Sequence, residues 1–174
     1  GLYVIATTYQ MYAVTFQSSL VVSPMVTALP HELDEFKRRN LVSGFLCCAL
    51  ILSFFSVIGV AVIAHFLGFY VPSLQLGTNT FPLMLAIVGF QLQDWLRRAL
   101  YAIQKTESVL ILDFMAYGGQ LLSLGILLFE KKLTPSSALL SLGGAFLIAA
   151  LVILIIRNMK PSYKQALIVA KTYW

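Results

Sequence analysis

Charged and hydrogen-bonding side chains recur at helical spacing in the segment GFQLQDWLRRALYAIQK, residues 89–105. Steps of three and four put side chains on one face of an α-helix, so the segment predicts one polar stripe. The stripe consists of Gln91, Asp94, Arg98, Tyr101 and Lys105. Asp94 can form an ion pair with Arg97 at i+3 or with Arg98 at i+4. These side chains suit either a hydrated path for a polar substrate or an internal ion pair that fixes helix packing.

Two other segments carry stripes of the same kind. Near the N-terminus the stripe consists of Thr8, Tyr12, Thr15, Ser19 and Ser23, with Gln10 and Gln17 nearby. Further along it consists of Asp113, Tyr117 and Gln120, beside Gly118 and Gly119, whose small size permits close helix contact. Asp113 lies near the short QKTES turn, so we expect it to form a salt bridge with Arg97, Arg98 or Lys105. The matching stripes favour the hydrated path.

Motifs for covalent or metal-dependent catalysis are absent from the sequence. It has no HExxH, no GxSxG, no glycine-rich phosphate loop and no cysteine or histidine cluster. Cys47 and Cys48 are adjacent, where a vicinal disulfide would be strained and metal-ligand spacing is missing, so we expect buried free thiols. The sequence therefore predicts neither an enzyme nor a protein with a metal or another cofactor.

The composition indicates a lipid environment. Hydrophobic residues make up 59% of the 174 residues, charged residues only 11%, and the mean hydropathy is +0.86. These values lie far outside the averages of soluble globular proteins. The net charge of +5 does not indicate nucleic acid, because the basic residues mark membrane orientation instead.

Five apolar segments are long enough to cross a bilayer, and long apolar runs without alternation are helices there. The expected spans are residues 2–29, 41–66, 83–103, 109–129 and 137–156. The second and fifth are nearly uniform hydrocarbon, so we expect them to face lipid or to act as spacers. The predicted fold class is an all-α membrane protein of about five transmembrane helices.

The distribution of Lys and Arg predicts the orientation. Eight of the twelve lie in alternate connections on one side of the membrane and two on the other. The positive-inside rule then places residues 30–40 and 157–174 in the cytoplasm. Residues 158–174 put apolar side chains on one helical face and read as an amphipathic helix on the membrane surface, or as a frayed chain end. That face consists of Tyr163, Ala166, Leu167, Ala170 and Trp174.

The order of several features resembles the polysaccharide (O-antigen type) flippases of the multidrug/oligosaccharidyl-lipid/polysaccharide exporter superfamily. These features are SSLVVSPMVTALP at the end of an apolar span, a basic loop, QDWLRRALYAIQK, LDFMAYGGQL and a final AKTYW. The resemblance covers nearly the whole chain. It implies two six-helix lobes about a central cavity, which export a lipid-diphosphate-linked oligosaccharide across the bacterial inner membrane by alternating access.

In that family the chain would be a fragment, and its opening with Gly1 rather than Met agrees with this expectation. Residues 1–157 would supply spans two to six of the first lobe, and residues 158–174 the linker to the second lobe. The implied partners are the lipid-linked glycan, membrane lipids and the missing second lobe, without nucleic acid.

The resemblance also implies roles for the polar stripes. Arg97 or Arg98 would attract the diphosphate or acidic sugars of the substrate, because a guanidinium can bind such anions bidentately. Asp94 would hold the arginines in position when substrate is absent. The remaining cavity residues are Gln91, Tyr101, Tyr117 and Gln120, which would bond glycan hydroxyls, with Asp113 and Tyr12.

Two other functions stay open. A cation-coupled drug exporter of the same superfamily would use Asp94 or Asp113 as its proton or sodium site. A non-transporting membrane assembly subunit would use the same charges to join helices.

Overall fold

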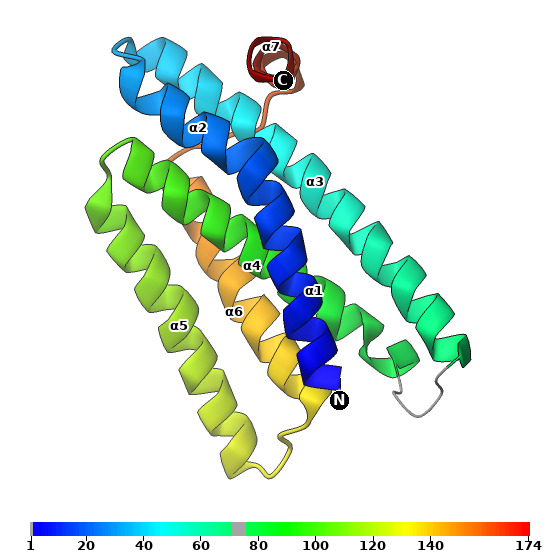
Figure 1. The fold of residues 1–174 in the computed structure, drawn as a ribbon. Helices are drawn as coiled ribbons and strands as arrows, with labels where there is room; N and C mark the ends of the chain where they lie inside the picture. Colours follow the sequence, from blue (N-terminus) through cyan, green and yellow to red (C-terminus); the bar gives the residue numbers. More distant parts are fainter. Residues whose placement is uncertain (1, 71–75) are drawn as a thin grey trace.

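The structure is a computed structural model that describes residues 2–70 and 76–174 (Figure 1). Every regular element in those ranges is helical, in agreement with the all-α prediction. In chain order the elements are α1 (Leu2–Gln17), the π-helical turn η1 (Ser18–Val22), α2 (Ser23–Ala28), the 3-10 turn η2 (Leu29–His31), α3 (Glu35–Tyr70), α4 (Leu76–Ala102), α5 (Thr106–Phe129), α6 (Pro135–Ile156) and α7 (Tyr163–Tyr173).

Four helical stretches in the described part of the chain are long and apolar enough to cross a membrane. They are Thr8–His31, Glu35–Phe66, Thr106–Phe129 and Pro135–Ile156. The architecture is therefore consistent with an all-α membrane protein. The helix that carries the third expected span, α4, has 27 residues and is about 40 Å long. It is not among the four, and its glutamines, Asp94 and two arginines make it more polar than they are.

The helices differ from the expected spans mainly at their ends. α3 begins at Glu35, before the expected start at residue 41, because Asp34 Oδ1 accepts a hydrogen bond of 2.9 Å from the Phe36 amide. α4 begins at Leu76 rather than at residue 83, so Asp94 lies in its second half and not near its middle. At 1.5 Å per residue, Asp94 is about 12 Å from the last residue of α4.

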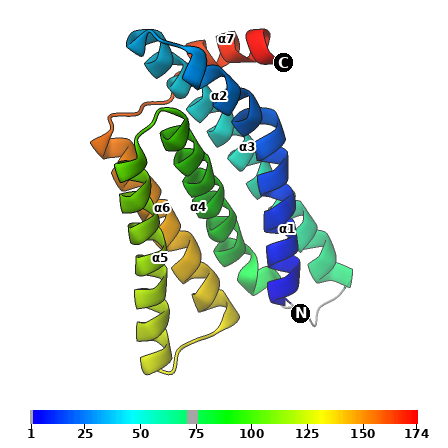
Figure 2. The same ribbon diagram turned by 60° about the vertical axis from the view of Figure 1, so that its left-hand side comes forward.

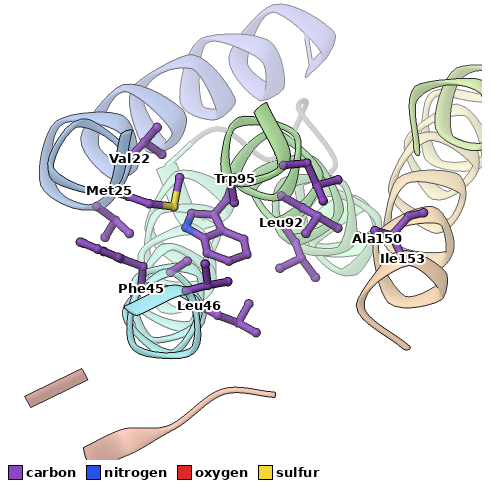
Figure 3. Packing of buried hydrophobic residues seen from close by; sticks show 14 of the residues in the cluster. Val22, Met25, Phe45, Leu46, Leu92, Trp95, Ala150 and Ile153 are labelled. Carbon is purple, nitrogen blue, oxygen red and sulfur yellow. The ribbon is translucent and has the colours of Figure 1, made fainter. Parts of the chain in front are cut away.

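The helix α4 lies in the centre of the bundle. Figures 1 and 2 both show it between α1 and α5, and it also packs along α3 and α6. Figure 3 shows its Trp95 ring among Met25, Phe45 and Leu46, and this ring has no exposed surface. The core therefore forms around the most polar of the long helices, whose polar groups must find partners on its neighbours.

The helices α4 and α6 are in backbone contact at two glycines. A Cβ atom on Gly143 would lie 2.6 Å from the backbone nitrogen of Ala86, and one on Gly89 would lie 2.5 Å from the Gly143 carbonyl oxygen. The expectation that residues 137–156 face lipid or act as a spacer is wrong, because α6 buries Phe146 and Ile153 in the core. Lipid tails are as apolar as leucine, so uniform hydrocarbon does not distinguish the two environments.

The first span passes through Pro24 without a break. Proline has no N–H, so the carbonyl of Leu20, four residues earlier, loses its usual helical donor. The chain forms the π-helical turn η1 just before this point, and the Trp174 indole Nε1 donates a hydrogen bond of 2.7 Å to that same carbonyl. The last residue of the chain thus bonds the carbonyl that the proline leaves free.

The C-terminal helix α7 packs against α3. A Cβ atom on Gly44 would lie 2.8 Å from the Gln165 carbonyl oxygen, and the rings of Phe45 and Tyr173 are 5.7 Å apart. The buried residues of α7 are Ala166 and Val169. Of the apolar face expected for residues 158–174, Ala166 is buried and Ala170 is half-buried, whereas Tyr163, Leu167 and Trp174 are exposed. The face that α7 packs against protein is therefore centred on Ala166 and Val169, and the membrane-surface role expected for the other face stays a prediction.

Candidate functional site: the charged cluster of α4 and α5

The charged cluster consists of Asp94, Arg97, Arg98 and Asp113. Asp113 on α5 is bound by two side chains of α4, which the short turn at residues 103–105 brings alongside. Gln93 Nε2 donates to Asp113 Oδ1 at 2.9 Å, and Arg97 Nε lies 3.4 Å from Asp113 Oδ2. The expected salt bridge of Asp113 is therefore present, with Arg97 as its partner. It joins two helices and satisfies both carboxylate oxygens.

Gln93 was not among the predicted site residues, because it lies beside the polar stripe and not on it. It is almost fully buried, and its amide ties α4 to α5. The signal that could have found it is its i,i+4 spacing from Arg97, which repeats the spacing of Asp94 and Arg98 one face away.

The second ion pair of the cluster lies within α4. Arg98 Nε donates to Asp94 Oδ2 at 3.0 Å, so of the two pairings allowed by sequence the i,i+4 pair forms. The Asp94 side chain is 16% exposed and that of Arg98 is 46% exposed. With both pairs formed, the cluster carries no net charge, and each carboxylate contacts its arginine at Nε.

Gln91 faces the interior and not the surface that exposes Arg98 and Tyr101. It has no exposed surface, and its Nε2 donates to Ser56 Oγ of α3 at 3.1 Å. The Tyr9 hydroxyl of α1 donates to the backbone oxygen of Ser56, also at 3.1 Å. The polar stripe of α4 is thus divided, because α3 covers one of its edges. Ser56 and Tyr9 were not predicted as part of the site.

Three buried polar atoms in the described part of the chain have no hydrogen-bond partner. They are Gln17 Nε2, Gln91 Oε1 and Trp95 Nε1. Buried polar groups without partners are uncommon and destabilise the fold, so each position is of interest. Gln17 comes from α1, and the other two lie one turn apart on α4. All three come from helices that pack in the bundle interior.

The other predicted residues are distributed over α1, α4 and α5. Tyr101 is exposed one turn beyond Arg97. Tyr117 is partly exposed, and its ring makes an edge-on contact with Phe146 of α6 at 5.2 Å between centroids. Gln120 is half-buried on α5. Tyr117 and Gln120 lie one and two turns beyond Asp113 on α5.

Tyr12 lies elsewhere, on α1. It lines a groove of about 380 Å³ between α1 and α3, together with Tyr9, Phe16 and Phe55. The hydroxyls farther along its stripe bond to their own helix: Thr15 Oγ1 donates to the Met11 carbonyl oxygen at 2.8 Å, and Ser19 Oγ to that of Thr15 at 3.0 Å. Thr15 and Ser19 therefore need no water to satisfy their hydroxyl donors.

No family model, no curated protein and no solved structure matches this chain. The family expectation thus stands on the sequence features alone, and the function must be argued from geometry.

Among the described residues we looked for metal-binding groups and for reactive thiols. No group of three or more His, Cys, Asp or Glu side chains gathers where it could hold a metal ion. Cys47 and Cys48 are free thiols, and Cys48 is buried. The charged cluster, with its two acidic and two basic side chains on two adjacent helices, is therefore the main candidate site.

Proposed function

We propose that this chain is part of an exporter that flips a lipid-diphosphate-linked oligosaccharide across the bacterial inner membrane by alternating access. The observation that carries the proposal is the charged cluster, whose four side chains remain 16% to 46% exposed on an otherwise apolar bundle. An Asp or Arg within a bilayer costs about 2.5 kcal/mol or more on insertion scales. Such a surface is favourable only where water or another polar protein surface covers it, as in a substrate cavity.

The proposed topology has five spans, with α4 as the third. α4 is long enough to cross, and its packing along α3 and α6 supplies partners for polar groups that lipid would not solvate. The Lys and Arg distribution puts residues 30–40 and 157–174 in the cytoplasm, and the cluster then lies in the cytoplasmic half of the bundle.

In the proposed mechanism the carboxylates and the substrate compete for the arginines. A diphosphate offers more acceptor oxygens than one carboxylate. It would therefore displace Asp94 from Arg98 and accept hydrogen bonds from both edges of the Arg98 guanidinium. Asp113 keeps hold of Gln93 and Arg97, which preserves the α4–α5 contact meanwhile. Tyr101, Tyr117 and Gln120 offer hydroxyl and amide groups to the sugars. Gln91 has no part in binding, because it is buried against Ser56.

The direct test removes the two guanidinium groups, with Arg97→Gln and Arg98→Gln in one variant. We expect glycolipid export to be abolished, while membrane insertion is unchanged, because the apolar spans are intact. The matched control is Lys131→Gln with Lys132→Gln, which removes two charges from the turn between α5 and α6. Export is measured as transfer of labelled glycolipid across the membrane, in cells that also supply the second lobe. Undiminished export by the arginine variant would refute the proposal.

A membrane assembly subunit is the second candidate function. It is favoured by the Asp113 contacts, because a carboxylate bound by both Gln93 and Arg97 joins two helices without any ligand. The exchange variant Arg97→Asp with Asp113→Arg separates the two proposals. Undiminished glycolipid export by the exchange variant would favour an assembly role for this pair. A folded protein that no longer exports glycolipid would favour substrate binding at Arg97.

A cation-coupled drug exporter is less well supported, since each carboxylate of the cluster already has an arginine partner. A proton or sodium ion would have to replace that partner. Loss of export of a lipophilic cation in Asp94→Asn or Asp113→Asn would restore this alternative.

A further inference from the structure

A basic pocket lies at one end of the bundle, away from the charged cluster. Its volume is about 600 Å³, and its walls come from the first turns of α3, the α4–α5 turn and the connection between α6 and α7. Figures 1 and 2 both show these three segments at the same end of the molecule. By the Lys and Arg distribution this is the cytoplasmic end.

Four cationic side chains line the pocket, with a single carboxylate, that of Glu35. The cations are Arg38, Arg39, Lys105 and Arg157. Glu35 is 89% exposed and lies 3.8 Å from Arg38, at the limit of an ion pair. The other three cations form no ion pair within the described part of the chain. The pocket therefore carries an excess of positive charge, whereas the charged cluster has no net charge.

The arginines are held by neutral acceptors. Arg39 Nη2 donates to the backbone oxygen of Asn158 at 3.3 Å, and Arg157 Nε donates to Ser108 Oγ at 2.9 Å. Ser108 is itself buried, so the base of the Arg157 guanidinium is fixed. Each arginine thus keeps N–H donors and its full charge for an anion, in a geometry that the helices set.

The rest of the pocket is largely apolar. Val42, Ile103 and Ile156 come from the three segments that form the walls, next to the cations. A site with guanidinium groups on one side and hydrocarbon on the other suits an amphiphile with a phosphate head. Anionic lipids of the cytoplasmic leaflet meet both requirements, and basic pockets between membrane helices bind their head groups.

We propose that this pocket binds the phosphate of an anionic membrane lipid and so ties together α3, the α4–α5 turn and the α6–α7 connection. The bound head group would be held by Arg39, Lys105 and Arg157. This site is separate from the proposed glycan path, because none of the cluster residues lines it. The same phosphate chemistry would also admit a free phosphate ester.

The experiment measures lipid adducts on the purified protein by native mass spectrometry, with phosphatidylglycerol titrated against phosphatidylcholine. Binding of phosphatidylglycerol should weaken about fivefold for each cation removed in Lys105→Gln and Arg39→Gln. The Lys105 side chain has no hydrogen-bond or ion-pair partner in the described part of the chain, so its replacement should leave the fold unchanged. Lys131→Gln with Lys132→Gln removes two charges at the opposite end and should leave binding unchanged.

Competition distinguishes the two sources of phosphate. Displacement of phosphatidylglycerol by glycerol phosphate at millimolar concentration would assign the site to free phosphate esters as well as lipids. Resistance to that displacement would assign it to the lipid, whose chains then contribute through the apolar wall. Equal binding of phosphatidylglycerol by the pocket variants, the control variant and the original protein would overturn the proposal, as would equal binding of phosphatidylcholine.

Discussion

Asp113 shows how single residues are bound in this protein. Its two oxygens are taken by different side chains, Gln93 and Arg97, both from the neighbouring helix. Asp94, by contrast, pairs with Arg98 inside one helix, a contact that any α-helix with this spacing could form. Of the two, the Asp113 contact is the one that stabilises the tertiary structure.

Two replacements of Asp113 should distinguish the stability contributed by its contact with Gln93 from that contributed by its contact with Arg97. We expect Asp113→Ala to lower the free energy of unfolding by about 1–3 kcal/mol, because Gln93 and Arg97 both lose their acceptor. Asp113→Asn keeps an oxygen for Gln93 and should cost less than about 1 kcal/mol, since Arg97 is partly exposed and screened.

Unfolding in mixed micelles, followed by circular dichroism, measures both values. Glu107→Gln, at an exposed residue in the first turn of α5, is the matched control. Equal stability of all the variants would show that the α4–α5 contact does not depend on Asp113.

Whole elements are positioned by small residues and by backbone groups. α4 meets α6 at Gly89 and Gly143, and α3 meets α7 at Gly44. In a bilayer, helices associate through close packing and not through burial from water, so glycine at a crossing brings the backbones together. The Leu20 carbonyl and Trp174 make a further link, between the first span and the end of α7.

A side chain at the α4–α6 crossing should separate these helices. Gly143→Val places its Cβ atom against the backbone of Ala86, so we expect a loss of about 1–3 kcal/mol of stability or more. Gly144→Val is the control, because a Cβ atom there meets nothing within 4 Å. Thermal unfolding in detergent compares the two variants. A Gly144 variant as unstable as the Gly143 variant would contradict this account of the crossing.

The Trp174 hydrogen bond should limit the opening of α7. Trp174→Phe removes the indole donor to the Leu20 carbonyl and keeps an aromatic ring. A hydrogen bond contributes about 1 kcal/mol, so amide exchange in the last turn of α7 should rise about fivefold. Tyr163→Phe, at the exposed start of α7, should leave exchange there unchanged. Hydrogen exchange read by mass spectrometry tests this, and equal rates in all three proteins would exclude the link.

The whole molecule is a bundle whose centre is its most polar long helix. α4 contacts α1, α3, α5 and α6, and its hydrogen bonds reach Ser56 and Asp113 on two of them. Gln91 and Gln93 thus find hydrogen-bond partners on neighbouring helices. This arrangement explains why a helix too polar for a lone span can lie among four apolar ones.

The sides on which the connections lie test whether α4 crosses the membrane. If it does, Lys105→Cys should react with a membrane-impermeant thiol reagent from the same side as Lys37→Cys, and Lys131→Cys from the opposite side. If it does not, Lys105 and Lys131 exchange sides. Both Cys47→Ser and Cys48→Ser are included to remove the native thiols. Labelling of Lys105→Cys and Lys37→Cys from opposite sides would refute the five-span topology.

The sequence alone predicted the helical fold class and an apolar, membrane-like character, and it limited the ion-pair partner of Asp94 to Arg97 or Arg98. These follow from composition and from spacing within one helix, where neighbours along the chain are neighbours in space. It also narrowed the partner of Asp113 to three residues, since the turn at residues 103–105 is short. The sequence did not predict that Gln91 is buried, nor that Tyr12 lines a groove between α1 and α3.

Only the tertiary structure decided which helix lies in the core and which face each polar residue presents. It placed α6 against α4, turned Gln91 toward Ser56, and bonded Trp174 to a carbonyl that is 154 residues away along the chain. It also gathered the basic pocket from three separate segments. The physical reason is that hydrocarbon side chains are equally favourable against lipid and against another helix, so apolarity reports the solvent and not the neighbour.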